Sequence, residues 1–157
     1  MGLYGAAFLA GVLGGLAYLA YQLDVHVRAW HVEIGWGRLV GVVVLAVFLG
    51  LYVYCSWQLT HRGQGAYVEF DPPSCFVADG PYRWVRNPVA SCVVGMVLGE
   101  AIALSSTGVF LLFAAGMVLA HLQVVLVEEP LLRKRFGEAY EEYCRRVPRW
   151  VPRRPGR

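Results

Sequence analysis

Four apolar stretches of membrane-spanning length constrain this chain more than any other feature. They occupy residues 3–23, 39–59, 89–106 and 108–127. A helix of roughly 20 apolar residues crosses about 30 Å of hydrocarbon and satisfies its own backbone hydrogen bonds there. With 57% hydrophobic and 16% charged residues, the chain does not have the composition of a water-soluble domain. We therefore expect an all-α, polytopic integral membrane protein with four transmembrane helices, forming a single domain over residues 1–157.

The basic residues predict the orientation of these spans. Nine of the fourteen lysines and arginines follow Pro130, and basic residues near the ends of spans are retained on the cytoplasmic side. Four spans then place both termini and the loop before residue 89 in the cytoplasm. Glycines at one-turn spacing, such as Gly11 and Gly15 or Gly95 and Gly99, predict close packing between helix backbones.

The fourth stretch carries ionisable residues, which are rare inside a membrane and usually face the protein interior or an aqueous cavity. Seven residues separate His121 from Glu128, and an α-helix turns nearly twice over that distance, so both side chains are expected to line one polar shaft. Glu129 and Pro130 follow at once. A bend at Pro130 and an amphipathic interfacial helix over residues 131–146, whose apolar face covers the site, are predicted next.

Two polar motifs bracket the hairpin formed by the last two spans. The first runs Gly-Pro-Tyr-Arg-Trp-Val-Arg-Asn-Pro over residues 80–88 and contains Tyr82, Arg86, Asn87 and Pro88. The second begins with Glu-Glu-Pro at residues 128–130 and continues through Phe-Gly at 136–137 and Tyr140 to Val-Pro-Arg at 147–149. In the predicted topology both motifs reach the same cytoplasmic mouth of the bundle.

These motifs, in this order and around a hairpin, resemble those of the isoprenylcysteine carboxyl methyltransferase and phospholipid methyltransferase superfamily. The resemblance covers residues 80–152. It implies methyl transfer from S-adenosylmethionine, bound from the cytoplasm, to a lipid-like acceptor that arrives from the membrane. The acceptor class stays open among a prenylated cysteine, a phospholipid amine and an isoprenoid or quinone-like molecule.

The implied donor assigns roles to the motif residues. Glu128 and Glu129 suit its sulfonium and ammonium groups, and Arg86 suits its carboxylate. The side chains of Tyr82, Asn87 and His121 are candidates for further polar contacts, and the resemblance adds Pro88 and Tyr140 to the donor site. Catalysis would depend chiefly on alignment in a dry cavity. A base, for which His121 or Glu128 is the candidate, is needed only for a protonated acceptor.

The sequence also bears on the class of acceptor and on functions other than methyl transfer. Prenylcysteine methyltransferases tend to have an arginine where this chain has Val124, which favours a different lipid acceptor. A non-catalytic membrane scaffold and a reductase using NADPH stay as alternatives. The four cysteines have no metal-ligand spacing, so no metal is expected. A net charge of +3 without a recognisable binding module argues against nucleic acid as a partner.

Overall fold

The computed structural model describes residues 3–26, 34–63 and 75–153, and these residues form helices and no strand, which confirms the all-α prediction. The body contains α1 (Leu3–His26), α2 (Gly37–Gly63), α3 (Pro88–Leu104) and α4 (Thr107–Gln123). The short 3-10 helix η2 (Gly80–Arg83) precedes α3. At the other end of the hairpin, the π-helical turn η3 (Val124–Glu128) leads from α4 into α5 (Glu129–Phe136), and α6 (Glu138–Arg146) follows.

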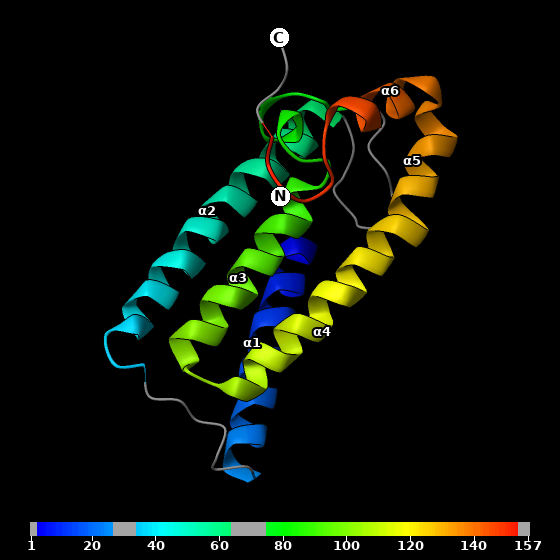
Figure 1. Cartoon of the computed structure of the whole chain (residues 1–157). Helices are drawn as coiled ribbons and strands as arrows, with labels where there is room; N and C mark the ends of the chain where they lie inside the picture. The colour runs from blue at the N-terminus through cyan, green and yellow to red at the C-terminus, as the bar shows by residue number, and fades with distance from the viewer. Residues whose placement is uncertain (1–2, 27–33, 64–74, 154–157) are drawn as a thin grey trace.

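Successive helices of the body run in opposite directions (Figure 1). The start of α1, the end of α2 and the start of α3 therefore lie at the same end of the bundle as α5 and α6. This arrangement brings the two polar motifs to one end, as the sequence predicts.

Two of the described helical segments are long and apolar enough to cross a membrane: Gly37–Gly63, with 27 residues, and the continuous segment Thr107–Phe136, with 30 residues. The other two predicted spans correspond to shorter apolar segments, Leu9–Leu23 and Pro88–Leu104. At 1.5 Å per residue, the 17 residues of α3 extend about 26 Å. The structure thus supports two spans, and the four-span arrangement stays a prediction.

Helices α2 and α3 form the most extensive helix contact, and glycine makes it possible. A Cβ atom added at Gly99 would lie 2.6 Å from the backbone nitrogen of Leu45 and 2.9 Å from the carbonyl oxygen of Gly41. Only residues without a side chain permit this approach. The predicted close packing of backbones is confirmed at Gly41 and Gly99, whereas Gly95 makes room for the ring of Phe48.

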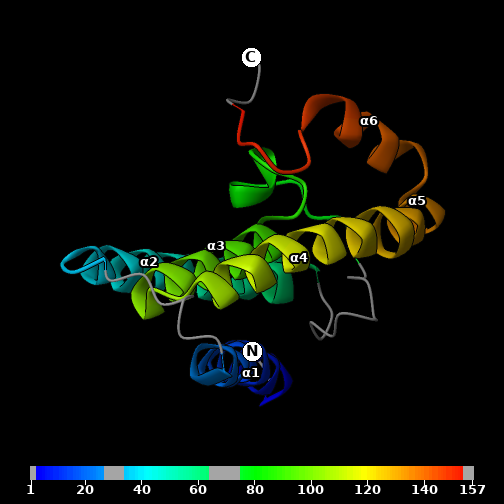
Figure 2. The same ribbon diagram turned by 60° about the horizontal axis from the view of Figure 1, so that its bottom comes forward.

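The prediction of close packing is wrong for α1. Among the described residues, nothing beyond the adjoining part of α1 itself lies within 4 Å of a Cβ atom added at Gly11 or Gly15. Helix α1 lies on one side of α2, α3 and α4, while the chain after α6 lies on the opposite side (Figure 2). The two glycines face a cavity instead of a helix backbone, because spacing along a helix does not reveal what lies opposite.

The C-terminal helix also differs from the prediction. The segment from α4 to α5 continues through Pro130, because the π turn shifts the hydrogen-bond register immediately before the proline, where an amide donor is missing. The break falls at Gly137, whose φ of +53° is unfavourable for other residues. The single helix predicted over residues 131–146 is therefore two helices.

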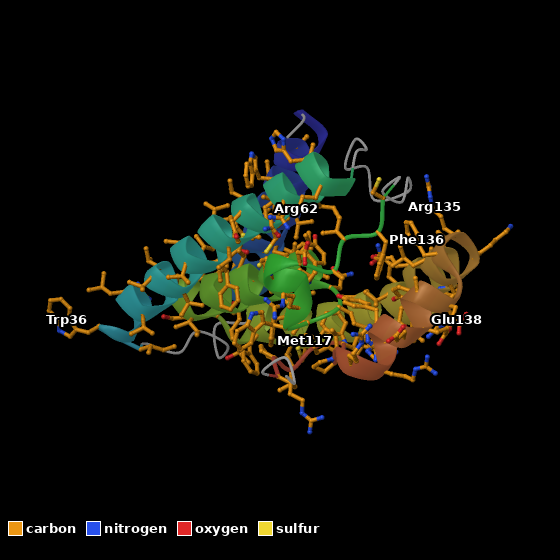
Figure 3. The ribbon with its side chains drawn as sticks, turned by 90° about the horizontal axis from the view of Figure 1, so that it is seen from above. Trp36, Arg62, Met117, Arg135, Phe136 and Glu138 are labelled. Atoms are coloured by element: carbon orange, nitrogen blue, oxygen red, sulfur yellow. The ribbon has the colours of Figure 1, made fainter. Side chains whose placement is uncertain are left out.

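The predicted amphipathic character is present in α6. Tyr140 and Tyr143 are buried, whereas the glutamates and arginines of the same helix are exposed. At this end of the molecule Arg135 and Glu138 point away from the body, and Trp36 marks the far end (Figure 3). The apolar face of α6 thus faces the polar motif that precedes α3.

Exchange of Gly99 for alanine tests the glycine contact. Overpacking against backbone atoms typically costs about 1–3 kcal/mol, so we expect G99A to lower the free energy of unfolding in detergent by that amount. The control is G50A, because a Cβ atom at Gly50 of α2 meets nothing within 4 Å. Equal stability of the two variants would contradict the proposed packing.

Candidate functional site

The site is built from the first turn of α3. Asn87 is the N-cap of this helix: its Oδ1 accepts a hydrogen bond from the backbone nitrogen of Ala90 at 3.0 Å, and Pro88 occupies the first helical position. The other end of the same amide, Nδ2, donates to Oε2 of Glu128 at 2.5 Å. One side chain therefore fixes both the helix end and the carboxylate.

Glu128 reaches Asn87 because it ends the π turn. This turn closes hydrogen bonds over five residues, as between the amide of Glu129 and the carbonyl of Val124. Such turns inside long helices are frequently found at functional sites. Gln123, five residues before Glu128, lies on the same side of the helix and faces the same cavity.

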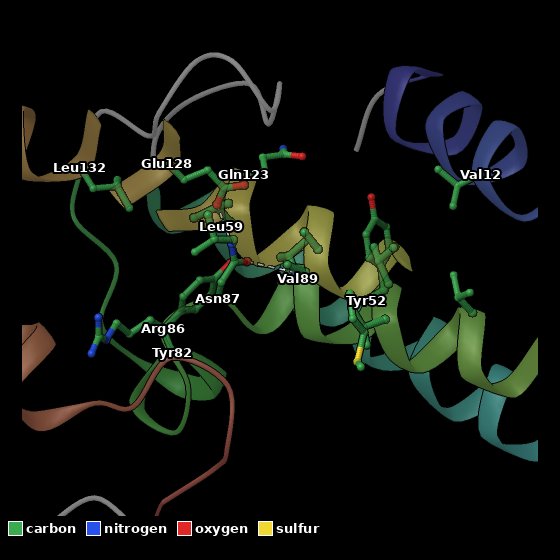
Figure 4. A pocket seen from close by; sticks show the side chains of 18 of the residues that line it. Val12, Tyr52, Leu59, Tyr82, Arg86, Asn87, Val89, Gln123, Glu128 and Leu132 are labelled. Carbon is green, nitrogen blue, oxygen red and sulfur yellow. Dashed lines mark hydrogen bonds between the residues drawn. The ribbon is translucent and has the colours of Figure 1, made fainter. Parts of the chain in front are cut away.

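A cavity of about 550 Å³ lies between these residues and α1. Its volume is within the range of pockets that hold small molecules. Figure 4 shows Tyr82, Asn87 and Glu128 around one part of it, and Val12 of α1 around another. The residues that line it include Gly11, Val12, Gly15, Leu16, Tyr52, Phe76, Tyr82, Arg86, Asn87, Val93, Val97, Phe113, Gly116, Met117, Gln123, Glu128, Leu132, Tyr140 and Tyr143.

The lining divides into a polar and an apolar end. The polar end is formed by Arg86, Asn87 and Glu128 beneath α5 and α6. The apolar end lies between α1, α3 and α4 and is lined by aliphatic and aromatic side chains and by glycine. A molecule with a charged head and an apolar body matches this division.

Tyrosines of α6 close the polar end. Tyr143 donates a hydrogen bond from its hydroxyl to the carbonyl oxygen of Tyr82 at 2.7 Å. Burial raises the pKa of Tyr140 and of Tyr143, so both phenols stay neutral at physiological pH and Tyr143 keeps its donor. The predicted apolar cover is thus present, with its tyrosines carried by α6.

Glu129 does not line the cavity, although it follows Glu128 directly. It is 2% exposed and lies among three guanidinium groups. The distances are 3.2 Å to Arg86, 3.2 Å to Arg133 and 2.6 Å to Arg149. The hydrogen bond that Arg149 donates to Glu129 raises the pKa of the Arg149 guanidinium. Adjacent acids therefore have different surroundings, one in the cavity and one in an ion cluster behind it.

Arg86 links the ion cluster to the cavity, which its side chain lines. Besides Glu129, its guanidinium donates to the carbonyl oxygen of Val147 at 2.7 Å and to that of Cys144 at 3.2 Å. Three contacts of this kind fix the plane of the group.

The structure brings together five of the eight residues predicted for the donor site at the cavity wall: Tyr82, Arg86, Asn87, Glu128 and Tyr140. Pro88 is buried in the first turn of α3 and Glu129 in the ion cluster, so neither lines the cavity.

The prediction that His121 and Glu128 line one shaft is wrong. His121 is exposed, and its Nδ1 lies 3.0 Å from Nε1 of Trp150, which donates to it. The prediction assumed 3.6 residues per turn throughout, whereas the intervening π turn changes the register. His121 and Glu128 therefore face different sides of the segment.

Sequence reasoning gave no role to several residues of the lining. Gln123 was visible as a polar residue in an apolar helix, a signal of an interior or cavity position. Phe76 and Tyr52 lack such a signal, because an aromatic residue on an apolar helix or loop is equally consistent with the core.

The geometry describes a pocket that suits an amphiphile with a polar, charged end. A family model for phospholipid methyltransferases matches residues 36–139, about two thirds of the chain. The chain therefore belongs to the phospholipid methyltransferase family. Its membership of this membrane family, together with two helices of membrane-spanning length, makes it an integral membrane protein. Neither the comparison with curated proteins nor that with solved structures gave a match.

Removal of the Asn87 amide tests the link between the two motifs. N87A removes the helix cap, which contributes about 1 kcal/mol, together with the donor to Glu128. We expect a larger loss of unfolding free energy in detergent than for S106A, which removes the N-cap hydrogen bond of α4. A loss in N87A no greater than in S106A would show that the Asn87–Glu128 contact contributes nothing to stability.

Proposed function

We propose that this protein transfers a methyl group from S-adenosylmethionine to a lipid-like acceptor in the membrane. The observation that carries the proposal is a single cavity with a charged end and an apolar end in a member of a methyltransferase family. A polar donor and a lipid would meet at the junction of the two ends. We further propose a multi-pass chain with both termini and the charged end of the cavity on the cytoplasmic side.

The residues present fit the donor. Glu128 offers a carboxylate for a cationic group, held in place by Asn87. Arg86 offers a guanidinium, oriented by Glu129 and two carbonyl oxygens, for a carboxylate. Phe76, Leu132 and Tyr140 line the same end and offer apolar walls for an adenine ring.

When bound, the donor supplies an activated methyl group on a sulfonium, whose charge disappears on transfer. The protein's part is to hold donor and acceptor in line and to exclude water. The apolar end orients the acceptor chain, and the tyrosines of α6 cover the charged end. For an acceptor that carries a proton, Glu128 is the carboxylate of the described cavity lining that can accept it.

The proposed donor pocket does not include His121, because its ring contacts Trp150 and is not part of the described cavity lining. Its proposed place is at the rim, where it contacts the chain that follows α6.

Removal of the Glu128 charge tests donor binding. A hydrogen bond to a charged group contributes roughly 1.5–3 kcal/mol, so we expect E128A to weaken S-adenosylmethionine binding about tenfold or more in calorimetry in detergent. E142A is the matched control, because Glu142 is exposed on α6 and pairs with Arg146. Equal affinity of E128A and the unaltered protein would exclude Glu128 from the donor site. Binding of NADPH in place of the donor would favour a reductase, and binding of neither would favour a scaffold.

Filling the apolar end tests the acceptor site separately. Gly116 lines the cavity, and a Cβ atom there meets nothing within 4 Å among the described residues, so a leucine side chain at this position starts in open space beside the apolar end. We expect G116L to lower the transfer of labelled methyl to extracted lipids several-fold and to leave donor affinity unchanged. G50L places the same side chain on α2 outside the cavity lining. Unchanged transfer in G116L would contradict an acceptor at this end.

A further inference from the structure

The chain after α6 returns to the motif that precedes α3. The backbone nitrogen of Arg86 donates to the carbonyl oxygen of Pro148 at 2.9 Å. The backbone nitrogen of Arg153 donates to the carbonyl oxygen of Trp84 at 3.4 Å. We call residues 147–153 the C-terminal strap. The strap contributes no residue to the cavity lining and lies beyond the residues that match the family. Any effect of the strap on the cavity must therefore pass through the residues that it contacts.

Arg149 is the strap residue with the strongest contact. Its Nε lies 2.6 Å from Oε1 of Glu129, and its Nη2 lies 3.0 Å from Oε2. Such paired hydrogen bonds fix a carboxylate in orientation as well as in position. Oε1 of Glu129 also accepts from Nη1 of Arg86 at 3.2 Å. Arg149 and Arg86 are thus joined by one buried oxygen atom, and only Arg86 lines the cavity.

The charges around Glu129 do not cancel. Arg86, Arg133 and Arg149 surround it, and Glu141 pairs with Arg133 at 2.8 Å. Three guanidinium groups and two carboxylates leave one positive charge in excess. All three arginines donate hydrogen bonds to Glu129, and of the three only Arg86 is also part of the cavity lining. Glu128, beside Arg86 at the polar end, adds a third carboxylate, so one guanidinium and one carboxylate line the cavity together and can meet the oppositely charged groups of one zwitterionic ligand.

We propose that Arg149 is a positioning residue that acts through Glu129 to orient Arg86 toward the carboxylate of the methyl donor. This inference rests on the proposed function. It gives the C-terminal strap a part in donor recognition without any contact between strap and donor. It also gives Glu129 a role different from that of its neighbour Glu128: its carboxylate transmits the position of Arg149 to Arg86.

Two donor molecules distinguish this role from a purely structural one. S-adenosylmethionine carries the carboxylate, and its decarboxylated analogue keeps the sulfonium, the amine and the adenosine. Calorimetry in detergent with the full-length protein measures both affinities. We expect R149Q to weaken S-adenosylmethionine roughly tenfold, the effect of a misplaced charge-assisted hydrogen bond, and to change the affinity of the analogue little. R146Q, which removes an exposed pair with Glu142, should change neither.

A double variant tests whether Arg149 acts through Arg86. If it does, R86Q/R149Q binds S-adenosylmethionine no more weakly than R86Q alone, because the effects of coupled residues do not add. R149K keeps the charge and the fold but not the paired hydrogen bonds, so we expect it to lose part of the preference for S-adenosylmethionine over the analogue.

Several outcomes overturn the inference. If R149Q weakens the binding of S-adenosylmethionine and of the analogue equally, Arg149 serves the fold alone. If R149K keeps the full preference for S-adenosylmethionine over the analogue, the paired hydrogen bonds are not needed. Additive losses in the double variant exclude action through Arg86. If the unaltered protein binds neither molecule, the proposed function fails first, and this result is distinct from loss of preference in a protein that binds both.

Discussion

A buried carboxylate among three guanidinium groups holds the charged end of this molecule together. Taking a charge out of water is costly unless it is paired and hydrogen-bonded, and Glu129 is paired on both oxygens. Its partners come from the chain before α3, from α5 and from the C-terminal strap. One residue thus connects segments that are far apart in the sequence, and the tyrosines of α6 are held over the cavity as a result.

The rest of the bundle depends on a different kind of contact. In lipid there is little hydrophobic gain from joining two helices, so packing of backbone against backbone becomes important. Helices α2 and α3 use it at Gly41 and Gly99. Helix α1 does not, and it contributes mainly a cavity wall. The molecule therefore combines a tightly packed pair of helices with a loosely attached neighbour, and the cavity lies between them.

The sequence allowed the helical class and the meeting of the two polar motifs to be predicted. Apolar stretch length and motif order were sufficient for this, because a hairpin must return its two ends to the same level. Residue-level placement failed where local geometry departs from a regular helix. The π turn moved His121 away from Glu128, and the positive φ of Gly137 split the last helix. The separate surroundings of Glu128 and Glu129 depend on Arg149, whose position only the tertiary structure reveals.

Helix α1 lies outside the residues that match the family, yet it supplies Val12, Gly15 and Leu16 to the apolar part of the cavity wall. The charged part is formed by residues from the opposite half of the chain. In the proposed function, α1 therefore shares the acceptor end with α3 and α4, whereas it contributes no residue to the charged end. Changes confined to α1 would thus reshape the apolar wall without touching the arginine, asparagine and glutamate of the charged end.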